Sequence, residues 1–197
     1  MDRITIDAYD TAAQAFADEW RDQPAPVDMY ALLTQHFAPG GRTADIGCGA
    51  GRDVAWLNAN GFPAVGYDAS PGLLEQARTR HPHLRFFDAA LPALDGIDDA
   101  SFDNILCETV IMHLPPDDIG DACSRLLAIL KPGGVLYLSW RVSEGESRRD
   151  ASGRLYASFD AALVTAAMRN ATIVSDTETV NQSSGKRVRR LIVRRAS

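Results

Sequence analysis

Cysteine is scarce in this chain, and the sequence has neither a long apolar run nor an excess of positive charge. The three cysteines, Cys48, Cys107 and Cys123, show no paired metal-ligand spacing and cannot form an even disulfide framework. No apolar run approaches the roughly 20 residues of a membrane-spanning helix, and the N-terminus lacks the apolar core of a signal peptide. These absences predict a cytoplasmic protein with no membrane partner, no disulfides and no metal site.

The net charge of −6 at pH 7 argues against a protein that binds phosphate backbones broadly, because such binding requires a basic face. The densest basic stretch, residues 186–195, surrounds a short apolar run, so solvated strand ends explain it better than a nucleic-acid contact does. We therefore expect a small-molecule partner, with nucleic acid disfavoured. The sequence leaves open whether the protein is a monomer or a homodimer.

The chain of 197 residues has 46% hydrophobic residues, which is typical of one globular domain. Segments expected to be strands alternate along the chain with segments expected to be helices, which predicts βαβ units and a parallel sheet. We expect an α/β fold with a doubly wound, mostly parallel seven-stranded Rossmann-like sheet that ends in an antiparallel strand pair. Strands are expected at 43–46, 64–67, 84–87, 102–107, 135–140, 172–180 and 188–195. Helices are expected at 9–20, 27–37, 52–60, 71–80, 115–130 and 159–169.

The most informative stretch is Asp45-Ile46-Gly47-Cys48-Gly49-Ala50-Gly51-Arg52-Asp53, which predicts a strand end, a tight turn and a helix start. Alternate glycines let a ligand lie against bare backbone, and the helix N-terminus offers free N–H groups. A dinucleotide fingerprint needs a third glycine where Arg52 stands. The Asp45 carboxylate would repel a pyrophosphate but suits a cation, which favours S-adenosylmethionine (SAM), with its ammonium and sulfonium groups.

This stretch resembles the first motif of class I SAM-dependent methyltransferases. The later motifs of that family are matched in order by residues 66–68, 87–90, 102–108 and 130–136. The resemblance covers residues of about 40–140 and implies one domain over 1–197 that uses SAM and releases S-adenosylhomocysteine, with helices of residues 1–40 capping the cofactor site. It implies that Asp68 binds the ribose hydroxyls and that Asp88 contacts the adenine amine. The implied cofactor contacts are Tyr9, Asp45, Gly47, Cys48, Gly49, Gly51, Arg52, Asp53, Asp68, Ala69, Asp88, Ala89, Ala90 and Glu108.

His113 and Glu108 are the candidate catalytic residues, because both follow the fourth expected strand, in the loop that faces the methyl group in the family. Imidazole titrates near neutrality, so His113 could take a proton from the methyl acceptor, although a structural role bonding to backbone explains it equally well. Glu108 could contact the cofactor's methionine portion or the acceptor, or could instead cap the loop.

Residues 141–158 are polar and without a clear period, so they form either a mobile lid over the substrate or an ordinary surface connection. Arg141, Arg154 and Tyr156 in or beside this segment are the candidate substrate-binding residues. An arginine here would hold an acceptor carboxylate through two hydrogen bonds, although surface solvation is the commoner fate of arginine.

We therefore expect methyl transfer from SAM to an N, O or S atom of a small molecule. An RNA or protein methyltransferase stays open, supported only by the arginine-rich C-terminus. A SAM-binding sensor or subunit without turnover also stays open, whereas Arg52 argues against a nicotinamide-dependent dehydrogenase. The sequence has neither an Asn/Asp-Pro-Pro-aromatic motif after the fourth strand nor a Pro-Cys nucleophile, which argues against two classes of nucleic-acid methyltransferase.

Overall fold

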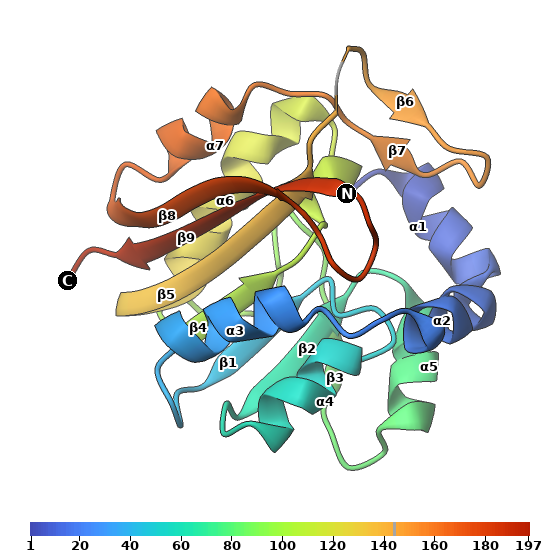
Figure 1. The fold of residues 1–197 in the computed structure, drawn as a ribbon, viewed down its shortest axis with the longest axis horizontal. Coiled ribbons are helices and arrows are strands. Elements are labelled where there is room, and N and C mark those ends of the chain that lie inside the picture. Colours follow the sequence, from blue (N-terminus) through green and yellow to red (C-terminus); the bar gives the residue numbers. More distant parts are fainter. Residues whose placement is uncertain (144) are drawn as a thin grey trace.

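A computed structural model describes residues 1–143 and 145–197 and shows one seven-stranded sheet at the centre of the fold (Figure 1). The strand order is β3-β2-β1-β4-β5-β9-β8, and β9 runs in the opposite direction to the other six strands of this sheet. The strands are β1 (Thr43–Ile46), β2 (Ala64–Asp68), β3 (Phe86–Asp88), β4 (Phe102–Cys107), β5 (Leu130–Arg141), β8 (Ala171–Val180) and β9 (Arg187–Arg195). This arrangement confirms the α/β sheet that the sequence predicts.

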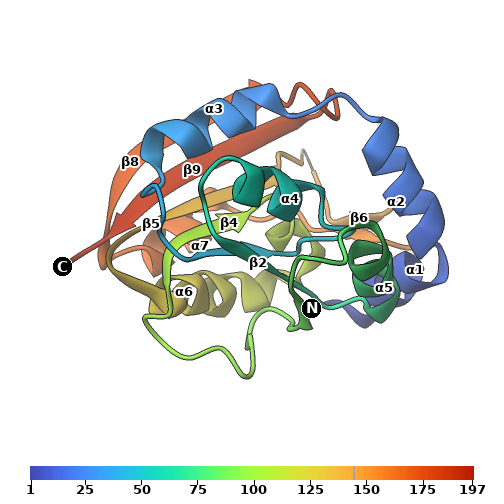
Figure 2. The same ribbon diagram turned by 90° about the horizontal axis from the view of Figure 1, so that it is seen from below.

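Helices cover both faces of the sheet, and two further helices lie across one of its ends (Figure 2). Apolar residues of α3 (Val27–His36), α4 (Arg52–Ala59) and α5 (Pro71–Arg80) form one core cluster with β2. Those of α6 (Ile119–Ile129) and α7 (Ala161–Ala167) form the other, together with residues 89–97. The helices α1 (Arg3–Thr11) and α2 (Ala13–Asp22) pack against α5 through Phe16 and Leu73. Their predicted role as a cap over the cofactor site stays a prediction.

The first predicted helix, 9–20, is two helices in the structure, and it begins earlier than its apolar period indicates. The chain leaves the helical region at Ala12, with φ −115° and ψ 25°, which separates α1 from α2. Asp2 starts α1, because its Oδ1 accepts a hydrogen bond from the Thr5 N–H at 2.9 Å. The fifth strand also begins earlier than predicted, since Leu130 pairs with Phe102 before an irregularity leads to the pairing of Val135 with Asn104.

Within the polar segment 141–158, β6 (Arg148–Arg149) and β7 (Leu155–Tyr156) pair as a hairpin, beside α1 in Figure 1. Three contacts anchor this hairpin. Arg149 forms an ion pair with Asp2 at 2.8 Å, the Leu155 N–H donates to Thr5 Oγ1 at 2.8 Å, and the Ala157 N–H donates to the Met112 carbonyl at 2.8 Å. Residue 144 lies outside the described residues, and the mobility expected of the segment stays a prediction.

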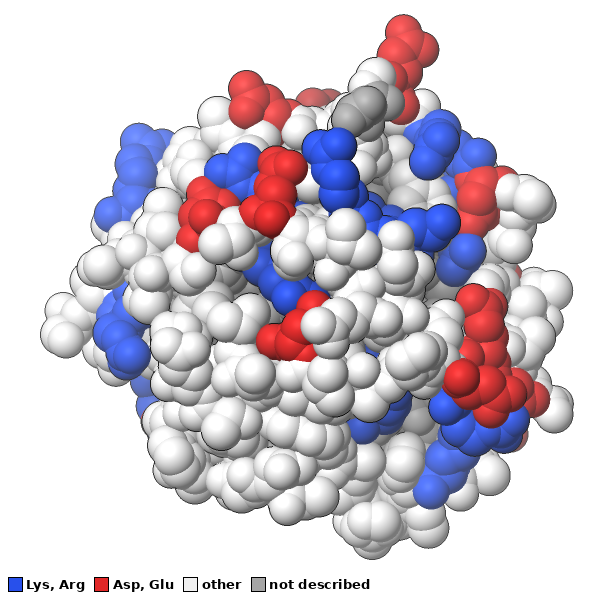
Figure 3. All heavy atoms as spheres, in the orientation of Figure 1, with Lys and Arg blue, Asp and Glu red and all other residues white. Residues whose placement is uncertain are grey.

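The basic stretch at the C-terminus belongs to β9, and its arginines have local partners. Arg189 pairs with Asp176 at 2.6 Å, Arg190 pairs with Asp28 at 2.7 Å, and Arg194 donates to the Gly133 carbonyl at 2.9 Å. On the face drawn in Figure 3, basic residues are interspersed with acidic ones. Within residues 1–143 and 145–197, no helix combines the length and apolarity needed to cross a bilayer.

Candidate functional site

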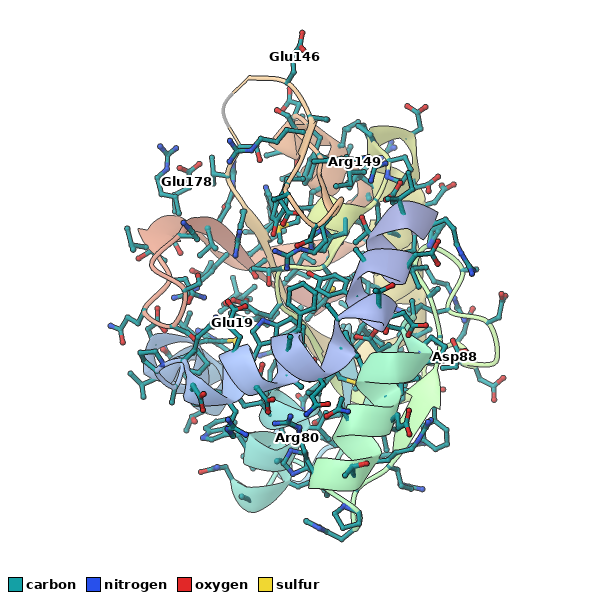
Figure 4. The ribbon with its side chains drawn as sticks, turned by 90° about the vertical axis from the view of Figure 1, so that its right-hand side faces the viewer. Glu19, Arg80, Asp88, Glu146, Arg149 and Glu178 are labelled. Carbon is teal, nitrogen blue, oxygen red and sulfur yellow. The ribbon has the colours of Figure 1, made fainter. Side chains whose placement is uncertain are left out.

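A cavity of about 480 Å³ lies at the ends of β1, β2, β4 and β5, beneath α1 and α2. Its size is typical of a small-molecule site, and the C-terminal edge of a parallel sheet is where open α/β folds bind their ligands. The hairpin β6–β7 and the turn between β8 and β9 close its remaining sides through Arg154, Tyr156, Asn181 and Ser183. Figure 4 looks across α1 and α2 onto this end of the molecule.

The glycine turn between β1 and α4 forms the floor of the cavity. Gly47 has φ +79°, and a Cβ added to it would overlap the side chain of Val110. A Cβ added to Gly49 would lie 2.8 Å from the Trp20 ring of α2. The N–H groups of Gly47 and Cys48 donate to the Tyr67 carbonyl at 2.8 and 3.0 Å, which ties the turn to the end of β2. Only glycine therefore gives this backbone its close approach to a ligand.

Carboxylates gather around the turn. Asp45 is 3% exposed, lines the cavity and makes no side-chain hydrogen bond to any described residue. Burial raises the pKa of Asp45 well above its usual range, and the negative charges of Asp53 and Asp68 raise it further. Asp68 accepts hydrogen bonds from the N–H groups of Gly49 and Ser70 at 2.8 and 2.9 Å. A cationic ligand group would relieve this concentration of negative charge.

Asp53 and Glu108 have partners within the protein. Asp53 accepts from Tyr30 Oη at 2.7 Å and forms an ion pair with Arg52 at 3.0 Å. Glu108 accepts from Ser139 Oγ and, at 2.9 Å, from Asn181 Nδ2. Burial raises the pKa of Glu108. Through these two hydrogen bonds, the Glu108 carboxylate anchors the turn between β8 and β9 to the end of β4.

His113 is 4% exposed and lies on the short 3₁₀ turn Ile111–His113. Its Nδ1 is 2.5 Å from the Leu155 carbonyl oxygen, and its Nε2 is 3.0 Å from Tyr9 Oη. A carbonyl can only accept, so Nδ1 carries the proton, and the neutral ring accepts at Nε2 from the Tyr9 hydroxyl. Burial lowers the pKa of His113 to about 4, which keeps the ring neutral near pH 7.

Two arginines approach the same part of the cavity. Arg154 forms an ion pair with Asp150 at 2.6 Å, and its guanidinium lies 5.3 Å from the centroid of the Tyr9 ring. The Arg141 guanidinium lies 5.1 Å from the centroid of the Tyr156 ring. Within the described residues, Arg141 has no carboxylate partner, so its charge is available to a ligand.

Comparisons with known proteins agree with this geometry. Residues 44–134 match a family model described as a methyltransferase domain. The fold is also similar to the crystal structure of a 1,6-didemethyltoxoflavin-N1-methyltransferase from Burkholderia thailandensis, which has 1,6-didemethyltoxoflavin and S-adenosylhomocysteine bound. The two structures superpose with a TM-score of 0.78 at 26% sequence identity, over 98% of this chain and 88% of that chain. The chain carries a class I SAM-dependent methyltransferase domain. The resemblance stated from the sequence motifs is thereby confirmed, and SAM, the predicted cofactor, is the methyl donor of this family.

Relatives of this methyltransferase domain act on different molecules. A trans-aconitate 2-methyltransferase from Methylobacterium radiotolerans is 39% identical over 95 residues, which are 47% of this chain and 35% of that protein. A ubiquinone biosynthesis O-methyltransferase from Paracidovorax citrulli is 30% identical over 106 residues, which are 51% of this chain and 43% of that protein. The chain thus spans between about a third and a half of the length of these relatives.

The structure places most of the predicted site residues of the methyltransferase in the lining of one cavity. These are Tyr9, Asp45, Gly47, Cys48, Gly49, Arg52, Asp53, Asp68, Ala69, Ala89, Glu108, His113, Arg141, Arg154 and Tyr156. Gly51, Asp88 and Ala90, all within the described part of the chain, lie outside that lining. Asp88 is exposed and sits at the periphery in Figure 4. The binding roles of all these residues stay proposals.

Sequence reasoning did not assign Asn181, Ser139 or Thr5 to the site. Asn181 is buried, lines the cavity and bonds to Glu108, which is 73 residues away in the chain. Ser139 reaches the same carboxylate from β5, and Thr5 joins α1 to β7. No local motif marks these residues, because each acts through a contact between distant segments.

Proposed function

We propose that this protein transfers the methyl group of SAM to an N, O or S atom of a small molecule that carries a carboxylate. The observation that carries the proposal is the charge distribution of the cavity. Among the residues that the structure describes, the buried carboxylate of Asp45 has no hydrogen-bond partner at one part of the lining, and Arg141 has no carboxylate partner at another. A cationic donor and an anionic acceptor would each meet an opposite charge there.

The residues around the glycine turn fit the donor. SAM supplies the methyl group on a sulfonium, which needs no further activation. Asp45, Gly47 and Gly49 would hold the cationic methionine end against the turn. Asp68 would bind the ribose, since a carboxylate has about four acceptor sites and the N–H groups of Gly49, Ser70 and Ala69 use only part of them. Ala69 and Ala89 would flank the adenine, and Asp88 stays a proposed contact to its amine.

The arginines of the cavity support an acidic acceptor. Five of them line it, and four have an acidic partner: Arg21 pairs with Asp22, Arg52 with Asp53, Arg80 with Asp18 and Arg154 with Asp150. The fifth, Arg141, ends β5 and stacks on Tyr156. This cation–π contact leaves the N–H groups of the guanidinium for a ligand, and a planar guanidinium suits the two parallel hydrogen bonds that an arginine forms with a carboxylate.

Calorimetry tests the donor half of the proposal. The wild-type protein is expected to bind SAM and not NAD, and Asp45→Asn is expected to weaken SAM binding by about tenfold or more, the effect of roughly 1.4 kcal/mol. Asp121→Asn removes a charge on the exposed side of α6 and serves as the control. Binding of NAD without SAM, or equal SAM affinity of the Asp45 variant and the control, would contradict the donor assignment.

Isotope transfer tests the acceptor half. The protein is incubated with methyl-labelled SAM and a metabolite extract that an anion-exchange resin has separated into retained and unretained fractions. We expect the label in a small molecule of the retained fraction, and a loss of that labelling with Arg141→Gln while SAM binding persists. Label in bulk RNA or in protein would favour the alternative acceptors, and SAM binding without any transfer would favour a non-catalytic SAM-binding protein.

A further inference from the structure

We propose that the Tyr9 hydroxyl, and not the His113 ring, takes the proton from the methyl acceptor and passes its own proton to His113. This inference rests on the proposed function, because it assigns the proton transfer at the same cavity. It makes Tyr9 the catalytic residue that touches the acceptor. His113 becomes the residue that receives the proton behind Tyr9.

The hydrogen bonds of His113 leave its ring no free nitrogen. Nδ1 donates to the Leu155 carbonyl, and Nε2 accepts from Tyr9 Oη. The Leu155 peptide is itself held in place, because its N–H donates to Thr5 Oγ1 at 2.8 Å and Thr5 is buried. The tautomer is therefore fixed by the hairpin β6–β7. An acceptor that entered the cavity could reach the basic lone pair of His113 only by displacing the Tyr9 hydroxyl.

The hydroxyl of Tyr9 is in the right bonding state to receive a proton. It donates its single hydrogen to His113, and one of its two lone pairs faces Arg154 Nη1 at 3.4 Å. One lone pair is left for a donor from outside the protein. Tyr9 lines the cavity from α1, and its ring packs against Phe16 and Trp20 with centroid separations of 5.0 and 5.9 Å. These contacts hold the hydroxyl beneath the hairpin.

The proton transfer balances with the groups present. The X–H proton of the acceptor moves to Tyr9 Oη as the Tyr9 hydrogen moves to His113 Nε2. The lone pair of X then forms the bond to the methyl carbon, and the carbon–sulfur bond breaks with its electron pair on sulfur. The resulting imidazolium keeps both hydrogen bonds, to the Leu155 carbonyl and to Tyr9 Oη. When the methylated product leaves, the Nε2 proton returns to Tyr9 Oη as Tyr9 releases its own hydrogen to water that enters the cavity, which restores the starting state.

The charges around the pair make this transfer depend on the acceptor. Burial lowers the pKa of His113, and the guanidinium groups of Arg154 and Arg141 lower it further. A carboxylate on the acceptor, bound at Arg141, would offset that positive charge and make His113 a better proton acceptor when the site is filled. The charged or titratable groups that face the pair are Arg141 of β5, Asp150 of the hairpin turn, Arg154, Tyr156 of β7, and Asp68 of β2.

The decisive variant is Tyr9→Phe, because the two possible bases predict opposite outcomes for it. Phenylalanine keeps the ring contacts with Phe16 and Trp20 and removes only the hydroxyl. The relay predicts that the rate of label transfer from methyl-labelled SAM to the extract falls by about 100-fold or more, the usual contribution of a general base. If His113 were the direct base, the variant would uncover Nε2, and the rate would persist or rise. Either of these results would overturn the proposal.

Two further measurements separate the relay from a loss of fold or of cofactor binding. SAM binding by calorimetry should be the same for Tyr9→Phe, His113→Gln and the wild-type protein. The control is Tyr67→Phe, which removes a tyrosine hydroxyl outside the cavity and should leave the transfer rate unchanged. Absence of SAM binding or of label transfer in the wild-type protein would overturn the proposed function itself. A Tyr9→Phe protein that binds SAM and keeps its rate would overturn the relay alone.

The protein without ligand offers a second test. Nitrogen-15 NMR of the imidazole should show His113 protonated at Nδ1 and unprotonated at Nε2 from about pH 5 to pH 8, where an exposed histidine would titrate. In Tyr9→Phe the Nε2 resonance should move toward that of an unbonded nitrogen. The opposite tautomer, with the proton at Nε2, would refute the relay, because Nε2 could not then receive a proton.

Discussion

Gly47→Ala should destabilise the protein and weaken cofactor binding together, because Gly47 meets two separate constraints at the floor of the cavity. Its φ of +79° lies in the left-handed region, where an L-residue with a side chain costs roughly 1–2 kcal/mol. An added methyl group would also overlap Val110, which is 7% exposed and cannot move far in a packed core. Overpacking of this kind costs a further 1–3 kcal/mol or so.

Gly61→Ala is the matched control for this variant. Gly61 has a φ of +84°, and no atom lies within 4 Å of an added Cβ, so only the backbone cost of roughly 1–2 kcal/mol applies. The difference in unfolding free energy between the two variants, about 1–3 kcal/mol, then measures the overlap with Val110. In the double variant Gly47→Ala/Val110→Ala, a large part of that difference should disappear, as a double-mutant cycle would show.

Urea denaturation gives the unfolding free energies, and calorimetry gives the SAM affinity of the same proteins. Gly47→Ala can relieve the overlap only by shifting the turn that faces the cofactor, so its SAM affinity should fall by about tenfold or more. Gly61 lies at the far end of α4 and outside the cavity, so Gly61→Ala should bind SAM normally. Equal destabilisation by the two glycine variants, or unchanged SAM binding by Gly47→Ala, would refute this reasoning.

Three other perturbations test the electrostatics of the site. Asp45→Asn should raise the melting temperature of the ligand-free protein near pH 7, because the raised pKa of Asp45 shows that its buried charge is unfavourable there. This gain in melting temperature should shrink as the pH falls through the raised pKa toward about 4, where the wild-type carboxyl is neutral in the folded protein. His113→Gln should make the free energy of unfolding less sensitive to acid. The pKa of His113 is lowered to about 4, so the wild-type protein should lose about 3 kcal/mol of unfolding free energy as the pH falls from about 6.5 to 4, at about 1.4 kcal/mol per pKa unit. Arg149→Gln should speed proteolysis of the hairpin β6–β7 at low salt, since it removes the ion pair with Asp2 that ties the hairpin to the start of α1, whereas Arg148→Gln should not.

The sheet could be predicted because its signals are local. The residues 43–46 and 102–107 are short segments that end in apolar residues and lie beside turn residues, and the structure places β1 and β4 at the predicted bounds. The helix α5 also has its predicted bounds, because Ser70 caps it and Pro71 occupies its first position. The hairpin β6–β7 had no such signal. Its short strands depend on contacts with α1, which lies about 150 residues earlier in the chain.

The donor half of the site could be predicted for the same reason. Asp45, Gly47, Gly49 and Asp53 lie within nine residues of the sequence, and one turn brings them to the cavity. The acceptor half comes from segments that are far apart. Tyr9 and His113 are separated by 104 residues, and His113 and Leu155 by 42. Residue type alone indicated that arginines near the fifth strand could bind an anion. It could not show that Arg154 pairs with Asp150, whereas Arg141 has no carboxylate partner in the described part of the chain.

The interpretation of His113 changes most when its surroundings are known. As a residue type near the end of β4, it is equally compatible with a general base and with a structural histidine. The structure combines these roles, because the bond from Nδ1 to the Leu155 carbonyl is structural and also decides that Nε2 is the basic atom. That atom faces Tyr9 and not the acceptor. The direction of proton transfer thus depends on a backbone carbonyl and a phenol from two other segments, which neither the histidine nor its motif could specify.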